Sequence, residues 1–253
     1  MKNKPNNFRD MGGLVCKDGK TIKPKKLIRS ASLFELSDAG KRMLDNLHID
    51  TVLDLRSNEE VANKPDYVPI GSTYTHLPVF DNKDFDLVVV SKEQTDRVLA
   101  LKGEGIDEMR RQKYMVYASM PFAKQTWNHL FESMDKGETI LFHCSEGKDR
   151  TGMAAAVIEY CLGRTMPQIA EQYLMSNEYV KWHNRKTQFL LLMLRKEKRL
   201  REVIQFCETV DMHQFNTAYT AALKNYDNID DFLLKEYNIT QARKTRWQSY
   251  YLQ

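Results

Sequence analysis

Apolar and polar residues fall into short blocks along the first two thirds of the chain, with two different spacings. Compact apolar runs at Ile49 to Leu55 and at Thr139 to Phe142 are typical of buried strands. From Pro121 to a stop at Gly137, apolar residues recur every three or four positions, which predicts an amphipathic helix whose aromatic stripe is buried in the core. The pattern therefore predicts that strands and helices alternate through this part of the chain.

Polar residues mark where further elements begin. Ser37 can cap one helix, and Ser57 with Glu60 has the spacing of a capping box for another. A strand is expected at 72–76. Residues 84–118 are mixed in polarity and are predicted to be helical, either as a lid or insertion over a pocket or as a connecting layer.

Beyond Gly163 the pattern is helical throughout, so a helix-rich part is expected at about 165–253. One helix begins at Thr165, and Lys181 to Cys207 is a long amphipathic stretch with a run of basic residues. We interpret this run as a solvated face in preference to a contact with a membrane or polyanion. The last helices are expected near Asp211 to Lys224, Ile229 to Tyr237 and Thr240 to Tyr250, the final two opening after Asn228 and Asn238.

Residues 143–152, His-Cys-Ser-Glu-Gly-Lys-Asp-Arg-Thr-Gly, join the second strand run to a segment of good helix formers. A cysteine, five intervening residues and an arginine can form a loop that closes around a phosphate group. Backbone N–H groups at the start of the following helix, with the helix dipole, favour an anion at this position. The expected phosphate-binding residues are Ser145, Glu146, Gly147, Lys148, Asp149 and Arg150.

Each residue type in this loop has a chemical reason. Cys144 attacks phosphorus as a thiolate, and Arg150 offers a planar fork that holds two phosphate oxygens. Gly147 lets the backbone turn sharply, the Thr151 hydroxyl can donate to the departing sulfur, and His143 is expected to support the loop. These roles predict a cysteine-dependent phosphatase, in which a phosphocysteine intermediate forms and is then attacked by water.

Other interpretations of the loop are weaker. A Walker nucleotide loop requires G-x4-G-K-[ST], and Phe142 and Asp149 occupy two of the required positions. A buried cysteine is often an inert small hydrophobe, but Cys144 stands between an apolar strand and an arginine that opens a helix. Sulfur transfer of the rhodanese type is a distant alternative that predicts no phosphate release.

Composition restricts the class of protein. Of the 253 residues, 42% are apolar and 28% charged, and the net charge of +4 is too small to indicate a nucleic-acid binder. No apolar run approaches the roughly 20 residues of a membrane span, and no signal-peptide core is seen, so we expect a cytoplasmic protein, with export by another route left open. The spacing of the four cysteines predicts neither a disulfide framework nor a zinc site.

The loop resembles the H-C-x5-R-[ST] signature of the protein tyrosine phosphatase superfamily. Its G-K-D-R-T-G form is similar to a bacterial group of tyrosine and phosphoinositide phosphatases related to secreted phosphatases of mycobacteria and Listeria. Other segments that resemble this group are Asn7 to Gly13, Leu27 to Ser30, Val52 to Arg56, Tyr173 to Asn177 and Ile229 to Leu252. The resemblance implies an α/β fold with a central, mainly parallel sheet flanked by helices, and catalysis without a metal or other cofactor. We expect one domain over residues 1–253, with a core plus a helical subdomain as the alternative.

Two aspartates are candidates for the general acid that protonates the leaving alcohol. Asp149 lies next to Arg150, and the resembling bacterial enzymes carry an aspartate there that is thought to be the acid. Asp81 follows a predicted strand, a placement similar to the mobile acid loop of other tyrosine and dual-specificity phosphatases. We favour Asp149, although either residue can also be a plain loop aspartate.

The loop indicates the substrate only weakly. Lys148 suits substrates with several phosphates, as it does in the resembling group, whereas the Glu146 carboxylate repels them. We expect phosphotyrosine in a protein as the substrate, with phosphoinositides or dual-specificity activity as alternatives. A further alternative is an inactive module that binds phosphorylated partners, which would need Arg150 but not Cys144. The sequence does not indicate an oligomeric state.

Five charged residues lie in the segments that resemble family signatures. We expect them to form a buried network that holds the loop, in preference to direct contact with substrate. They are Arg9, Asp10, Arg29, Asp54 and Arg56.

Overall fold

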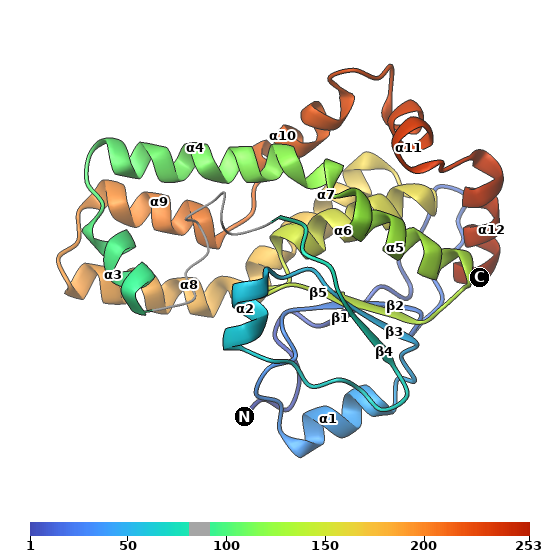
Figure 1. Ribbon diagram of the computed structural model, residues 1–253, viewed down its shortest axis with the longest axis horizontal. Helices are drawn as coiled ribbons and strands as arrows, with labels where there is room; N and C mark the ends of the chain where they lie inside the picture. Colours follow the sequence, from blue (N-terminus) through green and yellow to red (C-terminus); the bar gives the residue numbers. More distant parts are fainter. Residues whose placement is uncertain (81–91) are drawn as a thin grey trace.

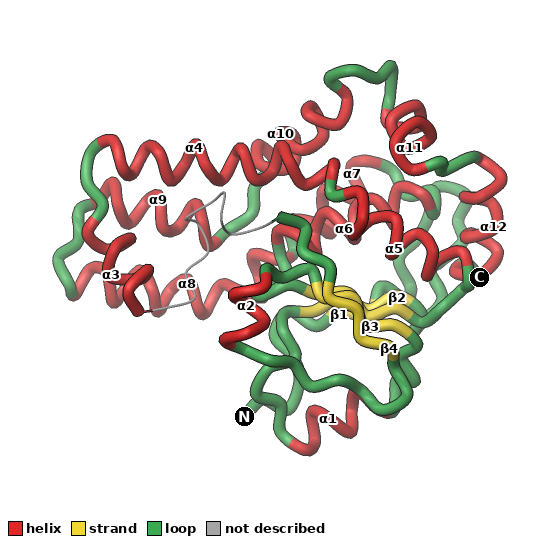
Figure 2. Tube along the Cα trace, viewed as in Figure 1, coloured by secondary structure: helices red, strands yellow, loops and turns green. Residues whose placement is uncertain are grey.

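The computed structural model describes residues 1–80 and 92–253. A five-stranded sheet has the order β1-β2-β5-β3-β4, in which β1 is antiparallel to β2 and the other neighbours are parallel (Figures 1 and 2). The strands are β1 (Arg9–Asp10), β2 (Leu27–Ser30), β3 (Thr51–Asp54), β4 (Thr73–His76) and β5 (Ile140–His143). The predicted α/β fold with a mainly parallel central sheet is confirmed.

Helices flank the sheet and make up most of the second half of the chain. In the first half of the described chain they are α1 (Asp38–Asp45), α2 (Asn58–Asn63), α3 (Lys92–Ala100), α4 (Glu104–Ser119), a 3₁₀ turn η2 (Met120–Phe122) and α5 (Lys124–Asp135). After β5 they are α6 (Asp149–Cys161), α7 (Met166–Leu174), α8 (Ser176–Met193), α9 (Lys198–Glu208), α10 (Met212–Leu223), α11 (Ile229–Tyr237) and α12 (Gln241–Tyr251). None of these helices has the length and apolar character needed to cross a bilayer.

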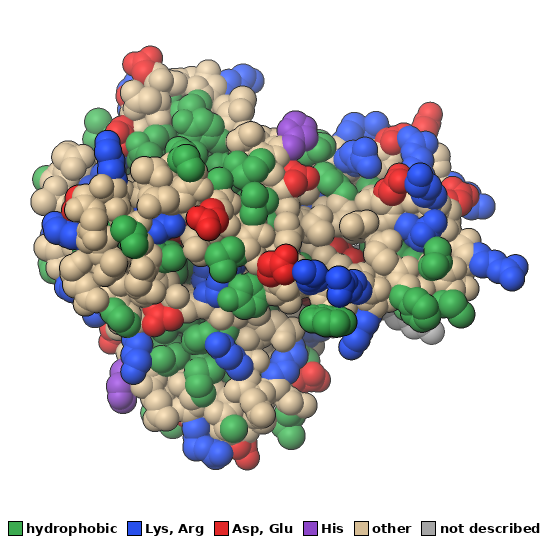
Figure 3. All heavy atoms as spheres, turned by 180° about the vertical axis from the view of Figure 1, so that it is seen from behind, with side chains coloured by type: hydrophobic (Ala, Val, Ile, Leu, Met, Phe, Trp, Pro, Cys, Tyr) green, Lys and Arg blue, Asp and Glu red, His purple; other side chains and the backbone are tan. Residues whose placement is uncertain are grey.

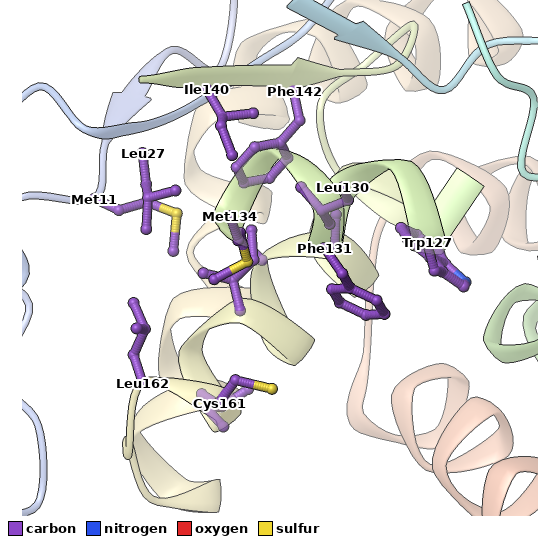
Figure 4. Packing of buried hydrophobic residues seen from close by; sticks show 14 of the residues in the cluster. Met11, Leu27, Trp127, Leu130, Phe131, Met134, Ile140, Phe142, Cys161 and Leu162 are labelled. Carbon is purple, nitrogen blue, oxygen red and sulfur yellow. The ribbon is translucent and has the colours of Figure 1, made fainter. Parts of the chain in front are cut away.

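The sheet separates two apolar cores because successive side chains of a strand point to opposite faces. Val52 and Leu141 pack with α1 on one face. Leu53, Ile140 and Phe142 pack on the other face, against α5 and α6 (Figures 1 and 4). Both faces are therefore covered, which explains why the strands read as continuous apolar runs instead of alternating ones.

The helix starts that the sequence indicates are present, with two differences further along. Ser37 caps α1, and Ser57 with Glu60 forms the predicted capping box of α2. The stretch predicted as one long amphipathic segment is two helices, α8 and α9, because the chain turns at Arg195, whose φ of 50° is left-handed. The second difference is at Asn238, after which the last helix was expected to open. Asn238 instead ends α11 in the left-handed region, and Thr240 is the N-cap of α12.

Four helices form an arm beside the sheet, on the left of Figure 1. The arm consists of α3, α4, α8 and α9 and has an apolar cluster of its own, with Ile106 and Met109 from α4, Leu191 from α8, and Val203 from α9. In the region predicted as helical between 84 and 118, α3 and α4 are the described part, and residues 84–91 lie outside the described residues. The arm matters because it reaches the loop that follows β5.

Candidate active site

The loop after β5 turns sharply into the first residues of α6. Cys144 directly follows β5, and α6 begins at Asp149, so the positive end of its dipole faces the loop. Gly147 has a φ of 67°, and a Cβ atom at this position would lie 2.5 Å from the carbonyl carbon of Ser30. Only glycine fits here, for both reasons, as the sequence predicted.

Arg150 is held in place by a glutamate from α2. Its Nη1 donates to Glu60 Oε2 at 2.6 Å and its Nη2 donates to Glu60 Oε1 at 2.9 Å, a two-pronged pairing. The guanidinium also lies 5.0 Å from the centre of the Phe80 ring. Both partners of the pair are buried, so the orientation of the Arg150 guanidinium is well defined before any ligand arrives.

Glu60 was missed as a candidate for this site, because the sequence shows only its capping role. Its Oε2 accepts from the Ser57 N–H at 2.8 Å, and its Oε1 accepts from the Ser145 hydroxyl. Burial alone would raise the pKa of Glu60, but Arg150 and these hydrogen bonds lower it to about 2. The capping box and the arginine clamp therefore share one carboxylate.

Residues from the N-terminal segment and β2 hold the back of the loop. Asn7 Nδ2 donates to the Gly147 carbonyl at 2.7 Å, and Arg29 Nη2 donates to the same carbonyl at 3.0 Å. Arg9 reaches the Ser176 hydroxyl at 2.8 Å, on α8. Arg9 and Arg29 thus contact the elements around the loop from behind.

A second buried network lies beneath the strand end that carries Cys144. Arg56 donates to both oxygens of Asp54 and to Asp66, and His143 Nε2 lies 3.3 Å from Asp66 Oδ2. Asp54, Asp66 and His143 also have the donor types of a metal site. The Arg56 guanidinium already supplies the positive charge between the two carboxylates, so their arrangement is explained without a metal ion.

Asp149 sits in a positively charged and hydrogen-bonded environment. Its Oδ1 accepts from the Tyr117 hydroxyl at 2.5 Å and lies 3.6 Å from Lys113 Nζ, while its Oδ2 lies 3.7 Å from Lys148 Nζ. Burial alone would raise the pKa of Asp149, but the two ammonium groups and the Tyr117 hydrogen bond hold it below its usual value. In this state the carboxyl group is ionised at neutral pH.

The same two lysines bind the C-terminal end of α9, Lys113 from α4 within the arm and Lys148 from the loop. Lys113 Nζ donates to the carbonyls of Phe206, Cys207 and Thr209, at 2.8, 2.9 and 3.0 Å, and Lys148 Nζ donates to the Cys207 carbonyl at 2.7 Å. These carbonyls lie at the C-terminal end of α9, where positive charge is favourable. Lys113 was not expected from the sequence, since nothing local distinguishes it from other lysines of a helix.

A cavity of about 590 Å³ opens between the loop and the arm. Five of the six predicted phosphate-binding residues line it: Ser145, Glu146, Lys148, Asp149 and Arg150. Its walls are largely apolar and come from α4, α8 and α9, with Val116, Tyr117, Leu191 and Ile204 among them. Cys144 is only 2% exposed and is not part of this lining.

Two further sequence-based expectations concern Asp81 and Thr151. Asp81, the second candidate for the general acid, lies outside the described residues. The Thr151 hydroxyl is buried and has no hydrogen-bond partner among the described residues, so the expected bond from Thr151 to the Cys144 sulfur is not formed in this state.

The chain belongs to the tyrosine phosphatase family, whose sequence profile matches residues 3–253. The resemblance seen in the loop and in the flanking segments is therefore confirmed.

Three relatives agree with this assignment. The triple specificity protein phosphatase PtpB of Mycobacterium tuberculosis is 30% identical over 190 residues, which cover 69% of this chain and 67% of the relative. A putative tyrosine-protein phosphatase of Cupriavidus necator is 29% identical, covering 68% of this chain and 60% of the relative. A tyrosine-protein phosphatase of Nostoc commune is 28% identical, covering 60% of this chain and 49% of the relative. The matched regions thus span about half to two thirds of the relatives.

Proposed function

We propose that this chain is a cysteine-dependent phosphatase that hydrolyses phosphotyrosine in proteins through a phosphocysteine intermediate. Membership of the family implies a phosphatase that acts on phosphorylated substrates. The observation that carries the proposal is the alignment of Cys144, the N-terminus of α6 and the clamped guanidinium of Arg150 around one loop. A phosphate in this loop meets backbone donors, a helix dipole and a planar arginine together.

The first chemical step transfers the phosphoryl group to sulfur. The Cys144 thiolate attacks phosphorus, the S–P bond forms, and the ester P–O bond breaks. The leaving oxygen takes a proton from Asp149, which we propose as the general acid. Bound phosphate places negative charge beside Asp149 and raises its pKa, so the carboxyl group gains its proton in the complex although it is ionised in the free protein.

The second step returns the enzyme to its starting state. Water attacks phosphorus, its proton passes to the Asp149 carboxylate, and the S–P bond breaks to release inorganic phosphate and the Cys144 thiolate. Arg150 binds the equatorial oxygens in both steps, and Glu60 keeps its guanidinium oriented.

The cavity supports an aromatic phosphoester as the substrate. The Phe80 and Tyr117 rings and the side chain of Val116 line the space beside the loop, and they can contact the phenyl ring of phosphotyrosine. Phosphoinositides are the second candidate, because Lys113 and Lys148 lie near Asp149 and can attract additional phosphates. Substitution Lys148→Met should then raise KM for a phosphoinositide and leave KM for a phosphotyrosine peptide nearly unchanged.

We also propose that the whole chain is one domain, with the arm as an integral wall of the site. The support is that Lys113 of α4 lies 3.6 Å from Asp149, that Lys148 of the loop donates to the Cys207 carbonyl of α9, and that α10 packs against both α4 and the main core. A single cooperative unfolding transition, followed at once by calorimetry and by circular dichroism, is the expected result.

The proposed function is tested by phosphate release in the presence of a chelator, with wild type, Cys144→Ser and the control Cys16→Ser. Substrates are a phosphotyrosine peptide, a phosphothreonine peptide and a phosphoinositide. We expect release by wild type and by the control, which alters a different buried cysteine, and none by Cys144→Ser. Binding of phosphate without release by the reduced wild-type protein would instead identify a phosphate-binding module.

A further inference from the structure

Helix α8 has one face against the cavity and an opposite face exposed to solvent. Asn184, Thr187 and Leu191 lie on the face that lines the cavity beside the loop. Trp182, Phe189, Leu192 and Met193 lie on the other face and are 71%, 65%, 55% and 66% exposed. Positions 182, 186, 189 and 193 are spaced by four, three and four residues, so they form one continuous stripe. We call this outward stripe, with Arg185 and Lys186, the α8 outer face.

Exposed apolar side chains are concentrated in this helix. Among the described residues, eight of the 16 large exposed hydrophobic side chains fall between Met175 and Leu194. Leu190 and Leu194 line the cavity and Met175 and Tyr179 lie near Arg9, which leaves Trp182, Phe189, Leu192 and Met193 as the group on the outer face. Scattered exposed apolar residues are normal on a protein surface, but a contiguous group of this kind marks a contact surface.

Basic residues predominate around the outer face, where the acidic Glu178 pairs with Lys181 at 3.0 Å. From Lys181 to Lys196 the sequence contains five lysines and arginines and no aspartate or glutamate. The guanidinium of Arg185 lies 5.2 Å from the centre of the Trp182 ring, so a basic and an aromatic group share the same patch. Figure 3 shows the molecule from behind, with hydrophobic, Lys/Arg and Asp/Glu side chains side by side on the arm at the right.

We propose that the α8 outer face docks on the surface of an anionic lipid bilayer. Aromatic and long aliphatic side chains beside lysines and arginines are the composition of helices that lie in the plane of a membrane interface. The apolar side chains insert at the boundary between headgroups and acyl chains, and the basic groups meet the anionic headgroups. The helix lies on the membrane and does not cross it.

The charge pattern favours a bilayer over a second copy of the chain. Pairing of two α8 outer faces about a two-fold axis would bring Arg185 and Lys186 of each copy together, while Glu178 of each copy is already paired with Lys181. An anionic bilayer neutralises these basic groups instead. Docking would place the opposite face of α8, and the cavity that it lines, close to the lipid surface. The proposal goes beyond the proposed function and does not require turnover.

Tryptophan fluorescence gives a direct test, because Trp182 is 71% exposed whereas Trp127 and Trp247 are 4% and 0% exposed. The full chain is mixed with phosphatidylcholine vesicles with or without about one third phosphatidylserine. With the anionic vesicles we expect co-sedimentation of the protein, a blue shift of its tryptophan emission, and quenching of that emission by brominated lipid. With the neutral vesicles all three effects should be small. Raising the salt concentration should weaken binding.

Two double variants separate the apolar and charged contributions. Phe189→Gln/Met193→Gln should lose binding to anionic vesicles by at least tenfold. Arg185→Gln/Lys186→Gln should weaken binding by about fivefold for each charge removed. The matched control is Val68→Gln/Ile70→Gln, which changes two apolar side chains that are 41% and 77% exposed in the segment before β4 and should bind as wild type does. Circular dichroism checks that each variant is folded.

The proposal is overturned if the wild-type protein does not bind anionic vesicles or binds neutral vesicles equally well. It is also overturned if wild type binds anionic vesicles no more tightly than the Phe189→Gln/Met193→Gln variant does. It is also overturned if light scattering shows a dimer that this variant dissociates, because the face is then a contact between copies. Vesicle binding without phosphate release would leave the docking surface standing and remove the phosphatase proposal, so the two failures are distinguishable.

Discussion

The Glu60 carboxylate accepts hydrogen bonds from both terminal nitrogens of Arg150, at 2.6 and 2.9 Å, although the two residues are 90 positions apart in the chain. The same carboxylate closes the capping box of α2. The position of α2 on the surface of the fold and the orientation of the phosphate-binding arginine therefore depend on each other. Five predictions follow from this pair and from its neighbours.

Substitution Glu60→Gln should impair catalysis more than a change at an exposed glutamate. The amide cannot make the same charged, two-pronged pair, so Arg150 loses its fixed orientation. We expect kcat/KM to fall at least about tenfold, equivalent to about 1.4 kcal/mol of transition-state stabilisation. Glu171→Gln, on an exposed position of α7, is the control and should behave as wild type. Equal kinetics for both variants would show that the clamp is not needed.

The contribution of Glu60 to stability should disappear in acid. Its pKa in the folded protein, about 2, is below its ordinary value of 4.5. The folded state therefore binds this proton less tightly than the unfolded chain, so the stabilisation is fully present above about pH 4.5 and is lost as the pH falls towards 2. Denaturant titrations should show a gap in the free energy of unfolding between wild type and Glu60→Gln that narrows from pH 5.5 to pH 3. A gap that stays constant with pH would contradict this explanation.

If Asp149 is the general acid, Asp149→Asn should remove the basic limb of the pH–rate profile. The loss in kcat should be about 10²- to 10⁴-fold for a poor leaving group and much smaller for an activated aryl phosphate. Asp81→Asn is the matched comparison and should keep the basic limb. The reverse result, with the limb lost only in Asp81→Asn, would transfer the role to Asp81.

Tyr117→Phe should move the basic limb instead of removing it. The Tyr117 hydroxyl donates to Asp149 at 2.5 Å and helps to hold the pKa of that carboxyl below its usual value. Without this hydrogen bond the pKa of Asp149 rises, so activity should persist to higher pH. Tyr114→Phe removes a hydroxyl one turn earlier on α4 and serves as the control. A shift of the limb to lower pH would show that Tyr117 does not act through Asp149.

Gly147→Ala should be far more harmful than Gly19→Ala. Both glycines have a positive φ, 67° and 85°, so alanine is strained at either position by about 1–3 kcal/mol. At Gly147 the added Cβ also meets the Ser30 backbone at 2.5 Å, whereas at Gly19 it meets nothing within 4 Å. Gly147→Ala should lower both the thermal unfolding temperature and the affinity for phosphate. Gly19→Ala should lower the unfolding temperature only by the amount that its backbone strain accounts for, and should leave phosphate affinity unchanged. Similar effects in the two variants would indicate strain alone.

Local sequence patterns were sufficient for the loop and for most of the elements, but not for the turn at Arg195 that separates α8 from α9. The capping residues Ser37 and Ser57, the apolar strand runs, and the glycine within residues 143–152 all act on their near neighbours, through hydrogen bonds, burial and backbone sterics. The order of the strands in the sheet does not follow from contacts between sequence neighbours. The mainly parallel sheet was expected only because the motifs resemble those of a family.

Tertiary structure decided which distant residues serve the loop. Glu60 reaches Arg150, and Lys113 and Tyr117 reach Asp149, because β3 lies next to β5 and because the arm packs against the loop. The solvent exposure of Trp182 and Phe189 could not be predicted from the sequence either, because the same apolar pattern is expected for a helix that is buried on both faces. A sequence specifies its turns and helices through contacts between neighbours. Which side chains meet across the chain depends on how those elements pack, and that is where the clamp on Arg150 was determined.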